Sequence, residues 1–391
     1  MMSMPSQMRS SSSTGGEEPV ATAIRFRTIW TPFDAAMREA MLRPTPGPVY
    51  YDGPEGDAFE REMAAYIGVG HGIAVSSGTA ALHLAMLALD LGPGDEVIGP
   101  ANGYLSVAEC TLNVGARPFY CDVVESTANM DISTVEPLVT SKTKAIVVIH
   151  TYGHPVDMDP IMDLARRRGI FVIEDVAHAL GGEYKGRKVG SIGDMGFVSF
   201  ARKCVTVAGQ GGMAFTSNPE WAKRIVRLRR HGWDRADAYR SRVAMVGFNY
   251  TLSECLAAVG RVSLARLDGH NTVRAANAQR YTEGLARRGV PARPFAVMPW
   301  AKHGWLHYVV RAPRRDELMA YLGTRGIECS IHYKHPVYRE PAYVARAGDD
   351  PGPRPVTDSL AREILTLPSH PEMGDGIDYV VDQIEAFYAD T

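Results

Sequence analysis

The strongest constraint on the fold is a regular alternation of short apolar runs with amphipathic segments. The runs "GIAVSS", "DEVIGPA", "KAIVVIHTYG" and "GIFVIEDVAHA" are typical of buried strands, and segments such as "MDPIMDLARRRG" are typical of helices. This alternation predicts an α/β fold with a mostly parallel sheet, right-handed crossovers and helices on both faces. Ligands in such folds bind at the carboxyl ends of the strands, so we expect the functional site there.

The chain divides into three parts on the same grounds. Residues 1–24 are rich in Ser, Gly and Met and predict a disordered tail, because such a composition buries little apolar surface. Residues 25–266 carry the alternating pattern and form the predicted large domain. A long helical pattern then leads to "HYVVRAPRRDELMAYLGTRGIECSIHY", which predicts a strand, a helix and a strand. We therefore expect a smaller C-terminal α/β domain over residues 267–391, with the boundary near Leu267.

Composition and charge exclude several classes of protein. The 391 residues include 42 basic and 44 acidic side chains, and this balance provides no overall field for nucleic acid or an anionic membrane. The five cysteines lack Cys-x-x-Cys spacing, which argues against a disulfide framework and a zinc site, so no metal is expected. The sequence shows no export signal and no long apolar run. These features together predict a cytoplasmic protein.

Two polar or aromatic features near predicted strand ends could bind a ligand. Ser76, Ser77, Gly78 and Thr79 stand where a helix begins, so free N–H groups and hydroxyls could hold a phosphate. The alternative is an ordinary helix cap. Tyr104 could stack on a flat cofactor, or it could pack in the core.

Acidic, imidazole and amine groups follow further along the chain. Glu174 and Asp175 end an apolar strand, and at least one carboxylate should reach the ligand edge, where it could pair with a cationic ring. A helix N-cap is the alternative for the aspartate. His178 could lie beside the same ligand or pack in the core. Lys203, in "SFARKCVTVAGQGGM", is either a surface charge or the amine that holds a cofactor.

Pyridoxal phosphate requires four groups together: a turn that binds its phosphate, an aromatic side chain that stacks on its ring, an acid at a strand end and a lysine. The lysine forms a Schiff base with the cofactor. The acid keeps the pyridine nitrogen protonated, so that the ring accepts electrons when a substrate Cα proton leaves.

The order of motifs resembles that of the DegT/DnrJ/EryC1/StrS family of PLP-dependent sugar aminotransferases. The matching stretches run from "GDAFEREMAAYIG" through "SSGTAAL", "GPGDEVIGPA", "HTYGHPVDMDPI", "EDVAHALGGEYKGRKVGSIGD", "GQGG", "RLRRHG" and "SECLAAVG" to "IHYKHP". The resemblance covers nearly everything after the tail. It implies a PLP-dependent transferase of fold type I that forms a homodimer, with both active sites at the subunit interface.

The resemblance also implies roles for individual residues around the cofactor. Residues at matching positions are the phosphate-binding pair Gly78 and Thr79, the ring-stacking Tyr104, the pyridine partner Asp175, the ring-hydroxyl neighbour His178 and the phosphate hydroxyl of Ser199.

Other matching positions concern the partner subunit and the substrate. Asn249 resembles the asparagine that reaches the cofactor phosphate from the neighbouring subunit, and Thr251 stands where relatives frequently have an arginine. His332, Tyr333 and His335 lie in the stretch that is near the sugar nucleotide in relatives.

The match at the lysine is imperfect. Relatives commonly place five steps between the phosphate serine and the lysine, whereas Ser199 and Lys203 are four steps apart. Either Lys203 is the Schiff-base lysine and the backbone absorbs the shortening, or another lysine serves; Lys185 and Lys188 lie in a basic turn. Downstream of Lys203, Thr206 and the paired glycines stand at the spacing that relatives show.

The implied reaction is a ping-pong exchange. Glutamate or glutamine leaves its amino group on the cofactor, and a keto sugar, expected to be an NDP-4-keto-6-deoxyhexose, takes it in a pathway of aminosugar biosynthesis. Lys203 moves the proton as general base and acid. In this family a histidine in place of the lysine goes with sugar dehydration, so the lysine favours amine transfer. Two alternatives stay open: a glutamine-dependent aminotransferase for a keto-cyclitol such as scyllo-inosose, and a non-catalytic regulatory protein with this fold.

Overall fold

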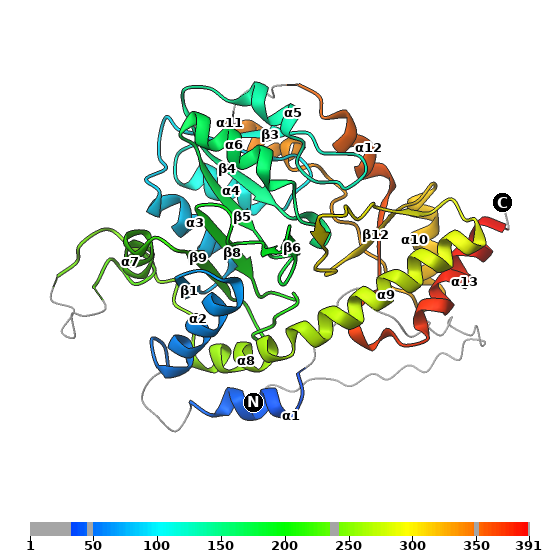
Figure 1. Ribbon diagram of the computed structural model, residues 1–391, viewed down its shortest axis with the longest axis horizontal. Helices are drawn as coiled ribbons and strands as arrows, with labels where there is room; N and C mark the ends of the chain where they lie inside the picture. Colours follow the sequence, from blue (N-terminus) through cyan, green and yellow to red (C-terminus); the bar gives the residue numbers. More distant parts are fainter. Residues whose placement is uncertain (1–32, 45–49, 235–241, 348–351, 390–391) are drawn as a thin grey trace, which may run out of the picture.

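A seven-stranded sheet forms the centre of the molecule (Figure 1). The computed structural model describes residues 33–44, 50–234, 242–347 and 352–389, so the predicted tail lies outside the described residues. The strand order is β1-β9-β8-β5-β4-β2-β3, and only β9 runs antiparallel to its neighbours. The predicted α/β fold with a mostly parallel sheet is confirmed. The strands are β1 (His71–Val75), β2 (Glu96–Pro100), β3 (Arg117–Cys121), β4 (Thr143–Ile149), β5 (Phe171–Asp175), β8 (Met195–Ser199) and β9 (Gly212–Thr216).

Helices cover both faces of this sheet because its strands are apolar on both sides. Along β4, Ile146 and Val148 pack into one core, whereas Val147 and Ile149 pack into the core on the opposite face. The first core includes side chains of α2 (Pro54–Ile67), α6 (Met158–Arg168) and α8 (Glu254–Ala265). The second includes side chains of α3 (Gly78–Ala88), α4 (Ser106–Asn113) and α7 (Pro219–Leu228). Shorter helices are α1 (Ala35–Leu42) and α5 (Ile132–Val135).

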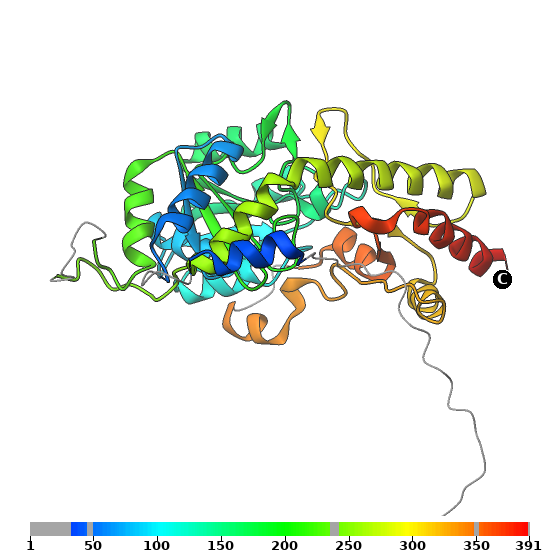
Figure 2. The same cartoon turned by 90° about the horizontal axis from the view of Figure 1, so that it is seen from below.

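The long helix α9 (Leu267–Arg288) joins the central sheet to the C-terminal elements. Its first residue, Leu267, belongs to a core of the central sheet, whereas Tyr281 and Leu285 belong to a separate C-terminal core. Figure 2 shows α13 (Gly376–Ala389) alongside the second half of α9. Because one helix contributes to both cores, the domain boundary at Leu267 stays a prediction.

A three-stranded antiparallel sheet, β10-β12-β13, lies in the C-terminal core. The predicted strand and helix after Leu267 correspond to β12 and α10. The predicted second strand, in "IECSIHY", is wrong: among described residues this segment forms isolated bridges only, one of them between Ser330 and Thr366. Its chain turns away at His332, whose carbonyl accepts a hydrogen bond from Tyr152 rather than continuing a ladder. The C-terminal elements are β10 (Arg293–Pro294), β12 (Tyr308–Arg311), α10 (Arg315–Gly323), α11 (Pro341–Ala347), α12 (Pro355–Glu363) and β13 (Ile364–Leu367).

A second small sheet links the two parts of the chain. It consists of β6 (Glu183–Tyr184), β7 (Arg187–Lys188) and β11 (Ala301–Lys302), in the order β11-β6-β7. β11 comes from the C-terminal third of the sequence, whereas β6 and β7 follow β5. The segment after β5 is therefore held against the C-terminal part.

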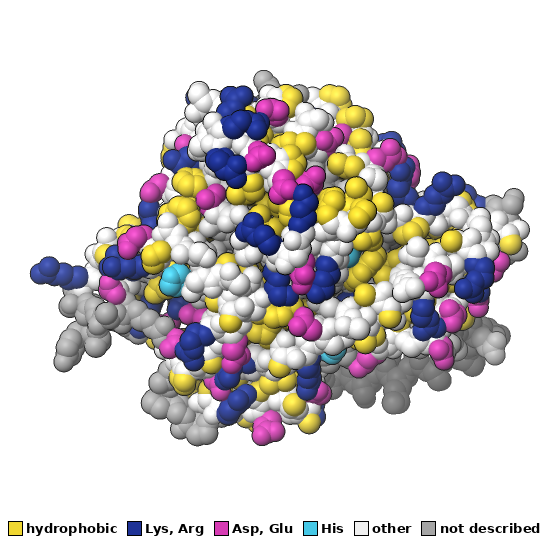
Figure 3. All heavy atoms as spheres, viewed as in Figure 1, with side chains coloured by type: hydrophobic (Ala, Val, Ile, Leu, Met, Phe, Trp, Pro, Cys, Tyr) yellow, Lys and Arg dark blue, Asp and Glu magenta, His cyan; other side chains and the backbone are white. Residues whose placement is uncertain are grey.

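Further observations concern the surface charge, the cysteines, the apolar character of the helices and possible metal ligands. On the face in Figure 3, basic and acidic side chains are interspersed. All five cysteines are free. Within the described part of the chain, no helix is both long and apolar enough to cross a bilayer. The same residues contain no cluster of three or more His, Cys, Asp or Glu side chains that could hold a metal ion.

Candidate active site

A cavity of about 440 Å³ opens at the carboxyl ends of the central strands. Ile149, Asp175 and Ser199 are the last residues of β4, β5 and β8, and each of them lines it. The turn from β1 into α3 lines it as well. The site is therefore at the sheet edge that the sequence predicts, because parallel strands end together there.

The N-terminus of α3 forms one wall of this cavity. The Oγ atom of Ser77 accepts a hydrogen bond of 3.0 Å from the backbone N–H of Ala80, so Ser77 is a helix N-cap. The first-turn N–H groups, including those of Gly78 and Thr79, have no acceptor within the helix and carry the positive end of its dipole. The cap and the anion site are thus two properties of the same turn.

Gly78 is required by the close approach of α3 to β8. A Cβ atom at this position would lie 2.6 Å from the Cβ of Ser199. The absent side chain brings the hydroxyl of Ser199 next to the helix N-terminus. Two segments more than 100 residues apart therefore meet at a point suited to a phosphate.

The alternation of β5 separates the two strand-end acids. Glu174 is fully buried and accepts hydrogen bonds from Nε2 of His150 at 3.0 Å and from the backbone N–H groups of Gly190, Ile192 and Gly193. Burial works to raise its pKa, but the bonds from His150 and the N–H groups outweigh burial and lower it. Glu174 is therefore a structural carboxylate that holds the loop before β8.

Asp175 points to the opposite side and lines the cavity. Its Oδ1 accepts a hydrogen bond of 2.8 Å from the N–H of Ala177, within its own loop. Burial raises the pKa of Asp175 to about 6, although the nearby charge of Lys203 works to lower it. A carboxylate with so little compensation is suited to pair with a cation in the cavity.

Lys203 lines the same cavity as Asp175. Burial lowers the pKa of the Lys203 amine, and the opposite charge of Asp175 only partly offsets this. A lowered pKa increases the fraction of neutral amine, which is the nucleophilic form. The other lysines that the sequence left open lie elsewhere: Lys185 pairs with Asp159 at the surface, and Lys188 pairs with Glu183.

The segment that is one residue short makes a tight turn before Lys203. Arg202 adopts a positive φ of 53°, a conformation that residues other than glycine rarely adopt. This turn brings Lys203 into the cavity despite the short connection from Ser199.

Three histidines gather on the C-terminal side of the cavity. The ring of His307 lies 4.8 Å from that of His178 and 4.2 Å from that of His332. Burial lowers the pKa of His332 to about 4, and the pKa values of His178 and His307 fall well below 6.5 for the same reason. All three imidazoles are therefore neutral near pH 7.

Tyr333 and Tyr152 extend this cluster. The hydroxyl of Tyr333 lies 3.4 Å from Nε2 of His178, and its ring faces that of Tyr104 at 6.1 Å. The hydroxyl of Tyr152 donates to the carbonyl of His332 at 2.5 Å. The segment around His332 is thus tied to the turn that follows β4.

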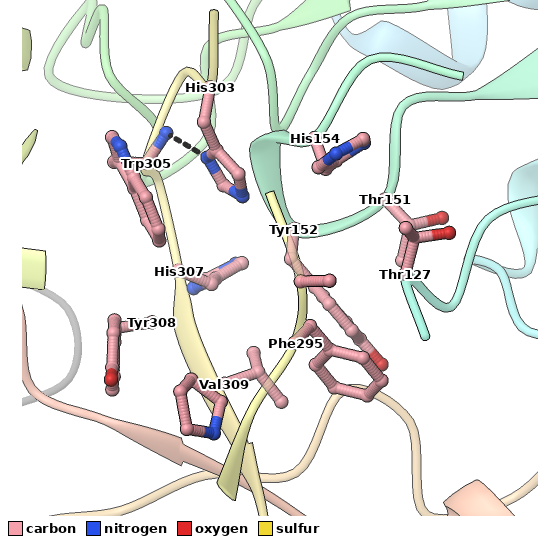
Figure 4. A pocket seen from close by; sticks show the side chains of 12 residues that line it. Thr127, Thr151, Tyr152, His154, Phe295, His303, Trp305, His307, Tyr308 and Val309 are labelled. Carbon is pink, nitrogen blue, oxygen red and sulfur yellow. Dashed lines mark hydrogen bonds between the residues drawn. The ribbon is translucent and has the colours of Figure 1, made fainter. Parts of the chain in front are cut away.

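His307 also borders a second, much smaller cavity (Figure 4). Figure 4 shows His154 on one side of this space and His303, Trp305 and His307 on the other. Its volume of about 20 Å³ is roughly that of one water molecule. The Nδ1 atom of His303 accepts a hydrogen bond from the N–H of Trp305, which directs the imidazole proton to Nε2.

The sequence-predicted residues divide into two groups. Those that line the cavity are Gly78, Thr79, Tyr104, Asp175, His178, Ser199, Lys203, His332 and Tyr333. Asn249 and His335 are exposed and do not line it. Thr251 forms an isolated bridge with Val75 at the end of β1. The predicted roles of Asn249 and His335 require a partner subunit or a bound substrate, so they stay predictions.

Sequence reasoning missed Arg202, Gln210 and His307, which also line the cavity. Arg202 stands beside the lysine in the sequence, and a charged neighbour of a candidate nucleophile is a signal that could have found it. His307 precedes β12, more than 100 residues away from Lys203 in the sequence. No local pattern indicates that it reaches the site.

The sequence model of the DegT/DnrJ/EryC1/StrS aminotransferase family matches residues 31–385. The chain belongs to this family. A curated relative, dTDP-3-amino-3,4,6-trideoxy-alpha-D-glucose transaminase of Streptomyces venezuelae, is 36% identical over 92% of this chain and 94% of its own.

Solved structures of other proteins have the same fold. DesV of S. venezuelae superposes with a TM-score of 0.85 at 36% identity, over 91% of this chain and 95% of its own. The PLP-form of the sugar aminotransferase Spr1654 of Streptococcus pneumoniae gives a TM-score of 0.87 at 26% identity, over 94% and 99% of the two chains. This member of the DegT/DnrJ/EryC1/StrS family is accordingly a PLP-dependent sugar aminotransferase of fold type I.

The residues of the cavity fit pyridoxal phosphate. A dianionic phosphate matches the α3 N-terminus beside Ser199, and a protonated ring nitrogen matches the buried carboxylate of Asp175. The Nδ1 atom of His178 is buried without a hydrogen-bond partner among the described residues, which is typical of a site that a ligand completes.

Proposed function

We propose that this aminotransferase moves an amino group from glutamate or glutamine to the ketone of a nucleotide-linked sugar, an NDP-4-keto-6-deoxyhexose. The observation that carries the proposal is that Lys203 and Asp175 face one cavity beside the N-terminus of α3. The S. venezuelae relative, named as a transaminase of a dTDP-linked trideoxyglucose, supports the choice of a nucleotide-linked sugar.

In this proposal each part of the cavity has one task. Pyridoxal phosphate, when bound, carries the amino group between substrates and withdraws electrons from the reacting carbon. Gly78, Thr79 and Ser199 hold its phosphate. Asp175 would hold the proton on its ring nitrogen, and His178 would stand beside the ring hydroxyl.

Lys203 has two tasks that follow from one lowered pKa. Its neutral Nζ would hold the cofactor covalently. Once released by the donor, Nζ takes the proton from the donor Cα and later delivers a proton to the sugar carbon that held the ketone. The same amine therefore serves both halves of a ping-pong exchange.

His332 and Tyr333 are proposed to contact the sugar, with His335 closer to the opening. A neutral imidazole both donates and accepts hydrogen bonds, which matches hydroxyl groups. The carbonyl of His332 is held by Tyr152, so these side chains are positioned before substrate enters.

We further propose a cytoplasmic homodimer with shared active sites. Val243 and Val246, close to Asn249 in the sequence, are 60% and 89% exposed. Exposed apolar side chains of this kind favour a protein–protein interface. The five free cysteines are consistent with a reducing compartment.

A panel of acceptors with product identification tests the proposed function. The panel contains 4-keto and 3-keto NDP-deoxyhexoses and scyllo-inosose, each with glutamate and with glutamine as donor. We expect turnover of a keto-deoxyhexose, and the product identifies the aminated carbon. Turnover of scyllo-inosose alone would favour a keto-cyclitol enzyme. Cofactor binding without turnover of any donor or acceptor would favour a regulatory protein.

A further inference from the structure

The active-site cavity has an unusual balance of charge. Its described lining contains two side chains that can carry a positive charge near pH 7, Lys203 and Arg202, and burial lowers the pKa of Lys203. The three histidines contribute none near pH 7, because burial depresses their pKa values. The charge of Lys203 interacts with Asp175, and covalent attachment of the cofactor occupies its amine. The guanidinium of Arg202 is therefore the remaining fixed cation.

Arg202 is exposed rather than packed, and no described carboxylate pairs with it. A guanidinium stays protonated at any physiological pH, and its planar fork matches a carboxylate or a phosphate with two parallel hydrogen bonds. The Arg202 guanidinium can therefore form both of these hydrogen bonds with a ligand in the cavity.

The backbone of Arg202 supports a functional role. Its φ of 53° is sterically unfavourable for a residue with a Cβ atom, and glycine would avoid this cost. The sequence nevertheless has arginine there, immediately before the lysine and inside the segment that is one residue short. Strain next to a reactive side chain is typical of positions selected for function.

The proposed substrates bring negative charge to this cavity. The amino donor has carboxylates, and the nucleotide-linked sugar has a diphosphate. We propose that Arg202 binds this anionic group of the substrates and is a specificity-determining residue of the site. The inference rests on the proposed function. The donor carboxylate and the acceptor diphosphate share the chemistry that Arg202 recognises, so the experiment must distinguish them.

Three variants of the cofactor-loaded enzyme test this assignment. Arg202→Gln removes the charge, and Arg202→Lys keeps the charge but loses the fork. Arg168→Gln is the control, because it removes an exposed positive charge at the end of α6, outside the cavity. For each variant we would measure Kd for glutarate and for thymidine and uridine diphosphates by calorimetry. KM in each half-reaction and Kd for pyridoxal phosphate complete the set.

We expect Arg202→Gln to weaken binding of one anion class roughly tenfold or more, with Arg202→Lys intermediate and the control unchanged. Weaker glutarate binding with a higher donor KM assigns Arg202 to the carboxylate. Weaker nucleotide binding with a higher acceptor KM assigns it to the diphosphate. In either case Kd for the cofactor should stay within about twofold.

Two results would overturn the proposal. One is a variant that matches the wild type in both half-reactions and with every probe. The other is a loss confined to cofactor affinity, which would place Arg202 at the cofactor phosphate. If the wild type turns over donor and acceptor while Arg202→Gln is normal, only this inference fails. If the wild type turns over no donor and binds no anion, the proposed function fails with it.

Discussion

Burial gives two side chains of the active site unusual acid–base properties. Asp175 and Lys203 would be fully ionised in water near neutral pH, yet burial raises the pKa of the acid and lowers that of the amine. A ligand can therefore interact with both groups: a protonated ring can pair with the carboxylate, and the neutral amine can form a covalent bond. Shifted pKa values of this kind are typical of functional sites.

Lys203→Ala should remain folded but lose cofactor attachment and catalysis. General acid–base groups contribute roughly 10²–10⁴-fold to rates, so we expect at least this loss in both half-reactions. Borohydride reduction of the wild type, followed by peptide mass spectrometry, should find the cofactor on the peptide that contains Lys203. Recovery on Lys185 or Lys188 would contradict the assignment.

The raised pKa of Asp175 predicts a pH-dependent stability difference. A carboxyl group with a folded pKa near 6 and an unfolded pKa near 3.8 binds more protons when folded, so its ionisation destabilises the fold as pH rises through this window. Asp175→Asn lacks this penalty. The stability of the cofactor-free variant relative to wild type should therefore increase between pH 4.5 and pH 7.5, by about 2 kcal/mol. Denaturant unfolding at both pH values measures it; an unchanged difference would contradict the burial of an ionised Asp175.

We expect Glu174, the acid next to Asp175 in the sequence, to stabilise the folded protein. Glu174→Ala leaves three backbone N–H groups and His150 without their acceptor, so the free energy of unfolding should fall by about 3–5 kcal/mol. Asp175→Ala should affect stability far less and amine transfer far more. Thermal denaturation of both cofactor-free variants, together with turnover of the loaded enzymes, separates the two roles. Equal stability losses would show that the two acids are misassigned.

At the scale of elements, the site depends on where strands end and how closely a helix approaches them. The cavity is formed by the ends of β4, β5 and β8 and by the first turn of α3. This arrangement requires α3 to contact β8 without an intervening side chain, which is the reason for Gly78. Helix dipole, free N–H groups and the Ser199 hydroxyl then converge.

Gly78→Ala should disturb this contact. Its Cβ would meet Ser199, so we expect a loss of about 1–3 kcal/mol in stability and weaker cofactor binding. Gly269→Ala on α9 is the matched control, because a Cβ atom added there would have no neighbour within 4 Å, and alanine favours a helix by about 0.5–1 kcal/mol. Chemical denaturation and cofactor titration measure both variants. A Gly78→Ala protein as stable as the control would contradict the close approach.

At the scale of the whole molecule, the proposed dimer would complete the site. Asn249 is exposed and lies outside the lining of the cavity within one chain. A role at the cofactor phosphate therefore requires that a second subunit supply it. The exposed Val243 and Val246 on the same stretch are consistent with such an interface.

Mixing two inactive variants tests the shared site. In a hybrid of Asn249→Ala and Lys203→Ala subunits, one site has both defects and the other has none. We expect up to about one quarter of wild-type activity after random exchange, because half of the dimers are hybrids with one intact site of two. Refolding each variant alone is the control. A fully active monomer, or no recovery after mixing, would contradict the shared site.

The sequence alone predicted the architecture and many of the residues that line the cavity. Apolar runs alternating with amphipathic helices predict the parallel sheet, because both periods are local properties of the chain. The parallel sheet in turn places Asp175 and Ser199 at one edge. The family motifs added the cofactor and the identity of Lys203 as a candidate. One local prediction was wrong: the segment before His332 forms isolated bridges only, and the carbonyl of His332 accepts a hydrogen bond from the Tyr152 hydroxyl.

Only the tertiary structure decided which side chains share the cavity. The local sequence pattern did not distinguish the roles of Glu174 and Asp175. Because successive side chains of a strand point to opposite faces, Glu174 is directed to backbone N–H groups and Asp175 to the cavity. His307 comes from the C-terminal part, and its position beside His178 depends on how that part packs against the turn after β4. In the sequence Arg202 is only the residue before Lys203. In the structure its backbone turns with a φ of 53°, and Arg202 lines the cavity. Such contacts depend on long-range packing, which no local pattern in the chain encodes.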